Sequence, residues 1–124
     1  MTDDAAIEDI RNNRDTALDA LEVAISRVGR EIAHTTTTGP YMDQITKRYR
    51  DLMSEASAIE AAATDAVLAL PSIMAAAGKL SSLATRMDTV AKKLPSATNV
   101  LGQTATILSL GQQIADLIAN AQKA

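Results

Sequence analysis

The chain has 124 residues, a net charge of −3, and a composition that is 47% hydrophobic but only 2% aromatic. This length fits one domain with one core, and without Phe or Trp that core has to consist of Leu, Ile, Val, Met and Ala. The negative charge argues against non-specific nucleic-acid binding, which depends on clustered Lys and Arg, and the lack of cysteine excludes disulfides and thiolate ligands.

The N-terminal segment, residues 1–9, predicts no secretory signal. It is acidic and contains neither a basic region nor an apolar stretch. Because the chain also lacks the cysteines that are common in oxidising compartments, we expect a cytoplasmic protein.

The first predicted helix spans residues 3–33. Its apolar side chains recur at steps of three and four, which places them on one helical face. They are Ile7, Ile10, Leu18, Leu21, Ile25, Val28 and Ile32. The next residues, 34–40, read HTTTTGP, a run of poor helix formers that predicts a turn.

The second predicted helix spans residues 41–70, and its apolar positions alternate steps of three and four throughout. They are Met42, Ile45, Tyr49, Leu52, Ala56, Ile59, Ala63, Ala66 and Leu70. Such a period over four heptads is typical of coiled-coil packing. Pro71 then interrupts the pattern, and either a turn or a kink within one long helix accounts for it, with a turn favoured.

The third and fourth predicted helices span residues 72–94 and 97–121, with Ser96 or Thr98 as the candidate cap of the fourth. The third stripe consists of Ile73, Ala76, Leu80, Leu83, Met87, Val90 and Leu94. The fourth consists of Val100, Ile107, Leu110, Ile114, Leu117 and Ala121, widened by Leu101, Leu108 and Ile118.

Four amphipathic stripes separated by short breaks predict an all-α fold. The expected architecture is an antiparallel four-helix bundle, a single domain over residues 1–124, with coiled-coil-like heptad packing. Alanine at recurring positions of the second and third stripes predicts an Ala-rich core in which the helix axes lie close together.

Glu31 and His34 have the E-x-x-H spacing that places a carboxylate and an imidazole on one helical face, as in di-iron sites of helical bundles. A complete site needs two such pairs, and His34 is the one histidine in the chain. We therefore interpret His34 as a surface residue near a helix C-terminus, where the helix dipole favours it, and expect no metal site.

Residues 47–50, which read KRYR, combine basic side chains with an aromatic ring and could hold phosphate or stack on a base. However, successive residues point in different directions on a helix, and Tyr49 belongs to the apolar stripe. Asp43 and Asp51 each lie four residues from Lys47, which fits ordinary ion pairs on a helix. A solvated helix face is the favoured interpretation.

Motifs for catalysis are missing. The sequence contains neither a P-loop nor a dinucleotide-binding glycine pattern, and nothing marks an orienting group for a serine–histidine pair. We therefore expect a non-enzymatic protein with no cofactor and no small-molecule substrate.

The charge of the chain is unevenly distributed. Residues 1–70 carry 13 acidic and 7 basic side chains, whereas residues 71–124 carry 2 acidic and 5 basic ones. The stretch 94–115 contains no charged residue at all. So little charge is unusual for a surface that faces only water.

The uncharged C-terminal half predicts an interaction surface on the fourth helix. Its back face carries small or uncharged groups, Gly102, Ala105, Ser109, Gln112 and Ala119. Small residues allow helices to approach closely, so we expect a helical protein partner or a second copy of the chain to cover this face. The alternative is a surface of low charge that faces water.

An alternative is a helical bundle that acts at a lipid surface, of the pore-forming or granule-coating type. It would open to expose residues 66–78 and 94–115, with the basic pair Lys92 and Lys93 meeting anionic lipid.

Overall fold

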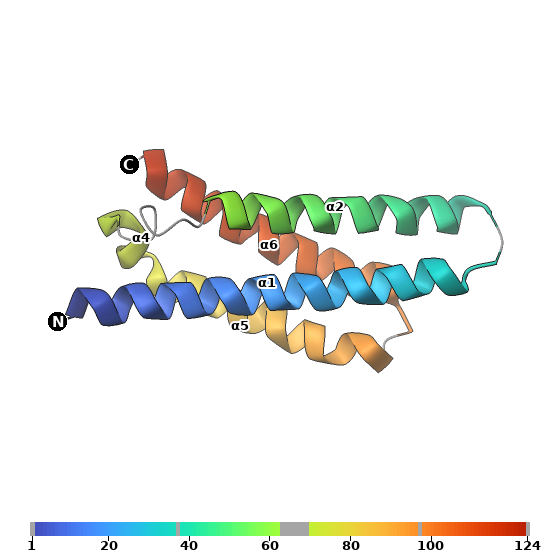
Figure 1. Cartoon of the computed structure of the whole chain (residues 1–124), viewed down its shortest axis with the longest axis horizontal. Helices are drawn as coiled ribbons and strands as arrows, with labels where there is room; N and C mark the ends of the chain where they lie inside the picture. The colour runs from blue at the N-terminus through green and yellow to red at the C-terminus, as the bar shows by residue number, and fades with distance from the viewer. Residues whose placement is uncertain (1, 37, 63–69, 97, 124) are drawn as a thin grey trace.

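The computed structural model describes residues 2–36, 38–62, 70–96 and 98–123 of the chain. Over these residues the protein is all-helical, with helices packed against one another and no strand, which confirms the predicted fold class (Figure 1). The α-helices are α1 (Thr2–His34), α2 (Pro40–Ala62), α4 (Pro71–Ala75), α5 (Ala77–Lys93) and α6 (Val100–Lys123), and a short 3-10 helix, η1, covers Leu94–Ser96.

The four longer helices α1, α2, α5 and α6 lie along the long axis of the molecule, and each runs opposite to the one before it (Figure 1). Their spatial order differs from their chain order. Helix α1 packs against α2 and α5, and α6 packs against the same two helices, so that α2 and α5 lie at opposite corners. Helices α1 and α6 also touch, across the other diagonal.

This spatial order makes two of the neighbouring pairs parallel. The Nε of Arg27 donates a hydrogen bond to the Leu94 carbonyl at 3.1 Å, joining the C-terminal ends of α1 and α5. The Nη1 of Arg48 donates to the Thr104 hydroxyl at 2.9 Å, joining the N-terminal halves of α2 and α6. The predicted antiparallel arrangement therefore holds within the hairpins α1–α2 and α5–α6, whereas the pairs α1–α5 and α2–α6 are parallel.

The buried side chains of the long helices recur every seven residues. These series are Ile10, Ala17 and Ala24 in α1; Ile45, Leu52 and Ile59 in α2; Ile73, Leu80, Met87 and Leu94 from α4 to η1; and Val100, Ile107, Ile114 and Ala121 in α6. Burying each large aliphatic side chain stabilises the fold by about 1.5–3 kcal/mol. Stripe positions such as Leu52, Met87 and Ile107 therefore lie in the core. In α1, however, the buried Ala17 and Ala24 were not on the predicted stripe, and stripe residues such as Leu18 and Ile25 are half-buried.

Both α1 and α5 bury alanine side chains. Ala17, Ala20 and Ala24 are buried in α1, and Ala84 and Ala91 are buried in α5. These two helices share the most extensive contact of any pair among the described residues. A core with alanine on both sides lets helix axes approach, because no side chain beyond Cβ separates them.

The second predicted helix was expected to reach Leu70. Helix α2 continues to Ala62, and residues 63–69, with the stripe positions Ala63 and Ala66, lie outside the described residues. Leu70 has an extended backbone, with ψ at 136°. One long helix kinked across Pro71 is therefore wrong, because Leu70 is not helical and α4 begins with Pro71 in its first turn.

The third and fourth helices also begin and end differently from the prediction. The predicted helix 72–94 is divided at Ala76, whose N–H bonds to the carbonyls of both Ser72 and Ile73 in a tightened turn. The fourth begins at Val100 rather than at residue 97, because the 3-10 turn η1 and a cap at Asn99 precede it.

Candidate functional site

The five residues predicted to form an interface lie on the surface of α6. Gly102, Ser109 and Gln112 are exposed, whereas Ala105 and Ala119 are half-buried. We call these five residues the α6 outer face. That a partner covers this face stays a prediction.

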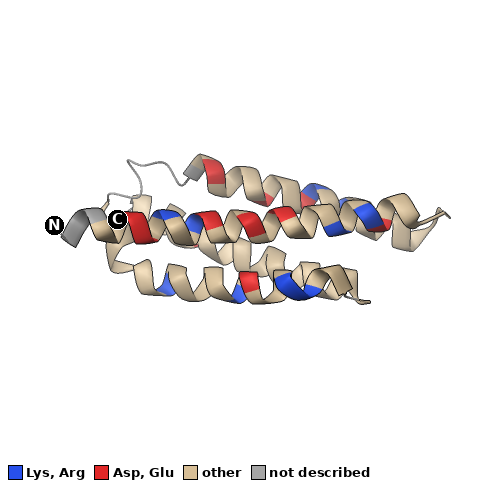
Figure 2. Ribbon diagram, turned by 60° about the horizontal axis from the view of Figure 1, so that its bottom comes forward, with Lys and Arg blue, Asp and Glu red and all other residues tan. Residues whose placement is uncertain are grey.

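The charge of the α6 surface differs sharply from that of α1. Between residues 100 and 122 the only ionisable side chain is Asp116. The exposed side of α1 carries Glu8, Asp9, Asp19 and Glu22. Figure 2 shows several acidic segments along the ribbon of α1 and mostly basic charged segments along that of α5 below it. A partner that covers the α6 surface therefore has to remove water from fewer charged groups than one that covers α1.

Gly102 has a local reason to be glycine. The Asn99 side-chain oxygen accepts a hydrogen bond from the Gly102 N–H at 3.0 Å and caps the first turn of α6. A Cβ at position 102 would lie 2.4 Å from the Asn99 amide nitrogen. Ser96 and Thr98, the predicted caps, are both exposed, and the role belongs to Asn99. Gly102 is thus explained by the cap before any partner is considered.

The basic cluster 47–50 is divided between water and protein. Lys47 is exposed and forms an ion pair with Asp51 at 3.5 Å, as the spacing predicted. Arg48 instead reaches across to α6, where its Nη1 donates to the Leu101 carbonyl and to the buried Thr104 hydroxyl. Tyr49 is half-buried at the seam between α1 and α2. The cluster therefore does not form one basic patch, and Arg48 joins two helices.

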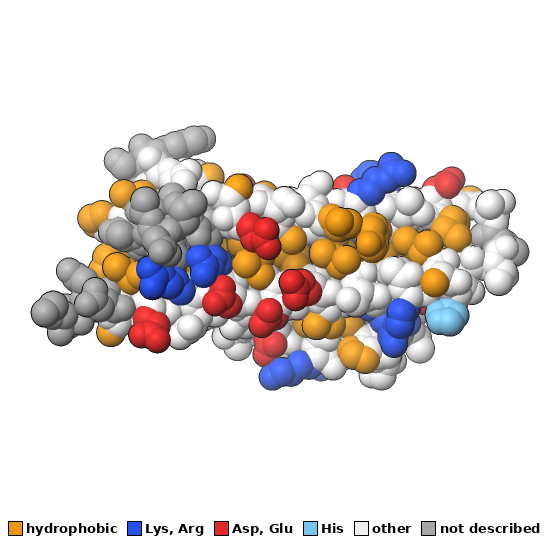
Figure 3. Space-filling view, viewed as in Figure 1, with side chains coloured by type: hydrophobic (Ala, Val, Ile, Leu, Met, Phe, Trp, Pro, Cys, Tyr) orange, Lys and Arg blue, Asp and Glu red, His pale blue; other side chains and the backbone are white. Residues whose placement is uncertain are grey.

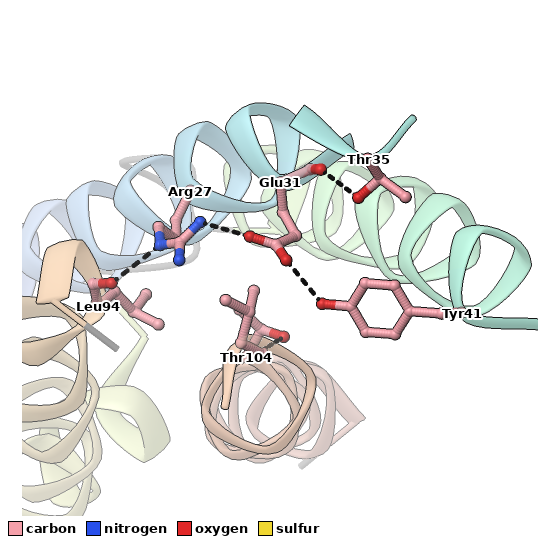
Figure 4. A network of polar contacts seen from close by, with 7 residues as sticks. Arg27, Glu31, Thr35, Tyr41, Leu94 and Thr104 are labelled. Atoms are coloured by element: carbon pink, nitrogen blue, oxygen red, sulfur yellow. Dashed lines mark hydrogen bonds and ion pairs between the residues drawn. The ribbon is translucent and has the colours of Figure 1, made fainter. Parts of the chain in front are cut away.

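Glu31 is held by a polar network at the end of α1, shown in Figure 4. Its Oε2 accepts from Arg27 Nη1 at 3.0 Å, and its Oε1 accepts from the Tyr41 hydroxyl at 2.9 Å. The bonds from Tyr41 and Arg27 lower the pKa of Glu31. Burial, followed by the bond to Glu31, raises the pKa of Tyr41. The network joins the two ends of the α1–α2 turn and connects them, through Arg27, to η1.

This network bears on the E-x-x-H spacing. Both carboxylate oxygens of Glu31 are occupied by protein donors, and His34 is exposed. Within the described ranges no group of three or more His, Asp or Glu side chains is close enough to hold a metal ion. Glu31 therefore serves as a structural acceptor here.

Glu55 is a partly buried carboxylate that the sequence analysis did not single out. Its Oε1 is buried without a hydrogen-bond partner among the described residues, and its Cγ lies over Gly111 of α6. Burial, reinforced by the negative charge of Asp116, raises its pKa. Its spacing, three residues after Leu52 and four before Ile59, could have drawn attention to it.

The seam between α1 and α2 is the most apolar part of the visible surface in Figure 3, where hydrophobic side chains form a strip with acidic side chains beside it. Leu18 and Ile25 of α1 and Ala56 of α2 are half-buried there, and Met53 is 47% exposed. Sequence reasoning assigned Leu18, Ile25 and Ala56 to the core stripes and did not single out Met53, so it did not predict that one edge of these stripes would face outward.

Comparisons of the chain with protein-family models, with curated proteins and with solved structures find no match. In the described part of the chain, no helix combines the length and apolar character that crossing a bilayer requires. The function has to be inferred from the surfaces described above.

Proposed function

We propose that this chain is a non-enzymatic helical interaction module that self-associates, or joins a larger assembly, through the α6 outer face. In this proposal the four long helices form a four-helix bundle with heptad packing, and the partner contributes a further helix. The seven-residue recurrence of buried side chains supports the packing. The cytoplasmic location and the absence of nucleic-acid binding remain predictions from the composition.

One observation carries the proposal: the exposed side of α6 has one ionisable residue, Asp116, between residues 100 and 122. Beside this exposed side, half-buried apolar side chains recur every seven residues. They are Leu101, Leu108 and Ala115. A second helix laid along this side would bury apolar and small groups while removing water from few charges.

The test is the mass in solution, measured by light scattering over a range of concentrations. The proposal expects a mass above the 13.0 kDa of one chain. Ser109→Arg places a charge in the middle of the α6 outer face and should shift the mass toward that of one chain. Ser54→Arg makes the same change on the exposed side of α2 and is the matched control. A wild-type chain that stays monomeric and does not associate with a partner helix would contradict the proposal.

A second candidate is action at a lipid surface, favoured by the exposed pair Lys92 and Lys93 in the last turn of α5. Of the two regions that would open, residues 66–69 lie outside the described residues, and 94–115 includes buried Val100 and Ile107. Lipid contact would therefore require separation of packed helices. Flotation with vesicles of anionic lipid at low salt tests this candidate, and vesicles that carry no protein would eliminate it.

A further inference from the structure

The seam between α1 and α2 contains a shallow groove of about 170 Å³. Leu18, Ile25, Met53 and Ala56 provide its apolar lining. Leu18 and Ile25 are seven residues apart in α1 and half-buried, which shows that the apolar stripe of α1 is wider than the core uses. The groove therefore offers apolar surface at the spacing that a packed helix uses.

The charged residues that line this groove are both acidic, and Arg14 lies beside Glu60 in an adjoining hollow. Glu22 of α1 and Glu60 of α2 line the groove from opposite sides, and both are exposed. They are the two charged residues among those that line it, and neither has an ion-pair partner among the described residues. An occupant that carries positive charges on both sides of an apolar stripe would complement this arrangement.

This charge pattern decides among the possible occupants. In a symmetric pair of copies joined at this groove, Glu22 and Glu60 would lie near their counterparts and repel them. Anionic lipid and nucleic acid would be repelled in the same way. The basic helix of this chain, α5, has polar side chains on its exposed side, at Ser82, Thr85 and Thr89, and so offers no apolar stripe to a second copy.

We infer that the α1–α2 groove, Leu18, Glu22, Ile25, Met53, Ala56 and Glu60, binds a basic amphipathic helix of a partner protein. Apolar side chains spaced three and four residues apart on that helix enter the groove, and Lys or Arg beside them pair with Glu22 and Glu60. This inference rests on the proposed role as a helix-binding module, but it uses a different surface from the α6 outer face and a partner of defined charge.

The experiment uses the full chain and two synthetic helical peptides that share one apolar stripe of leucines. One peptide carries lysines beside the stripe and the other carries glutamates at the same positions. Fluorescence anisotropy of the labelled peptides should show binding of the lysine peptide that weakens as salt is added, and at least tenfold weaker binding of the glutamate peptide.

Two variants locate the site. The double variant Glu22→Lys with Glu60→Lys should weaken binding of the lysine peptide by about tenfold. Asp19→Lys reverses an exposed charge on α1 that does not line the groove, and it should leave the affinity within about twofold. Met53→Lys, at an exposed position, should weaken binding without unfolding the chain, which circular dichroism verifies.

Three results would overturn the inference: equal binding of the two peptides, an equal loss in Asp19→Lys and the double variant, or a mass of the free chain that falls in Met53→Lys, which would assign the groove to a second copy. If the lysine peptide fails to bind while Ser109→Arg still lowers the mass, only this inference is lost. If the lysine peptide does not bind and Ser109→Arg leaves the mass unchanged, the proposed function fails as well.

Discussion

Two partly buried carboxylates, Glu31 and Glu55, have surroundings that shift their pKa values in opposite directions. Glu31 lies at the end of α1, where Arg27 and Tyr41 donate to both of its oxygens. Glu55 lies in the C-terminal half of α2, where one oxygen is buried without a donor among the described residues and the negative charge of Asp116 acts on it. The pKa of Glu31 is lowered and that of Glu55 is raised.

The comparison teaches that hydrogen-bond donors lower the pKa of one carboxylate, whereas burial without a donor raises that of the other. Because its folded pKa is lowered, Glu31 contributes stability above its ordinary pKa of 4.5 and loses it as pH falls through the folded value. Glu55, whose folded pKa is raised, favours the folded state below its ordinary value of 4.5 and loses that contribution as pH rises through the folded value. The two residues therefore give opposite slopes of stability against pH.

The largest expected effect comes from removing Arg27, which donates both to Glu31 and to the Leu94 carbonyl. Arg27→Met should lower the free energy of unfolding by about 1.5 kcal/mol, because Glu31 loses a charged donor and the Leu94 carbonyl loses its side-chain donor. Urea unfolding at pH 7 measures this. Lys92→Met is the matched control: it breaks the pair with Asp88, in which Lys92 is 76% exposed, and should cost under about 0.5 kcal/mol. If both variants lost the same free energy of unfolding, the Glu31 network would stabilise the fold no more than a surface ion pair does.

Tyr41→Phe tests the second donor. The loss of its 2.9 Å bond to Glu31 should lower the free energy of unfolding by about 0.5–1 kcal/mol. The pKa of Glu31 should rise toward its ordinary value, because the Tyr41 bond is the largest cause of the lowering. A titration followed by NMR measures the shift directly, and an unchanged pKa would show that Arg27 alone sets it.

Glu55→Gln should act in the other direction. Removing a charge that burial disfavours is expected to raise the free energy of unfolding at pH 7 by about 0.5 kcal/mol. At a pH well below 4.5 the gain should vanish, since Glu55 is then protonated in both states. Unfolding at a series of pH values checks this, and a variant that is less stable at pH 7 would contradict it.

Gly111→Ala is expected to have the smallest effect on the free energy of unfolding and a clear effect on the pKa of Glu55. Alanine favours the helix by up to about 1 kcal/mol, but its Cβ would lie 3.0 Å from Glu55 Cγ, and the two terms should nearly cancel. The displaced carboxylate should gain water, so its pKa should fall. Gly78→Ala, with nothing within 4 Å of the added Cβ, reports the helix term alone.

The hydrophobic spacing was sufficient to predict helices and most core positions, because burial on one face imposes a seven-residue recurrence that a sequence displays directly. The spacing could not decide which of two neighbouring positions on one helix is buried. Leu117 was placed on the central stripe of the last helix and is half-buried, whereas Ile118, assigned to its edge, is buried. Alanines were underweighted in α1, where Ala20 and Ala24 belong to the core.

Features that depend on three-dimensional neighbours could not be predicted from spacing. A stripe does not specify which helix lies beside it, so the reach of Arg48 across to Thr104 was missed. The same limit applies to Glu55, whose burial and raised pKa depend on the packing of α6 against α2. The candidate interface on α6 followed from low charge alone, and the apolar groove between α1 and α2 required the actual pairing of those helices.

The placement of α2 and α5 at opposite corners has a consequence for how the chain assembles. Each hairpin, α1–α2 and α5–α6, consists of helices close in sequence, but the contacts of α1 with α5 and of α2 with α6 join residues more than fifty positions apart. Local pairs should therefore form early, and docking of the two hairpins should limit the folding rate. For the same reason, a chain cut between α2 and α4 would leave two complementary halves that restore the fold when mixed.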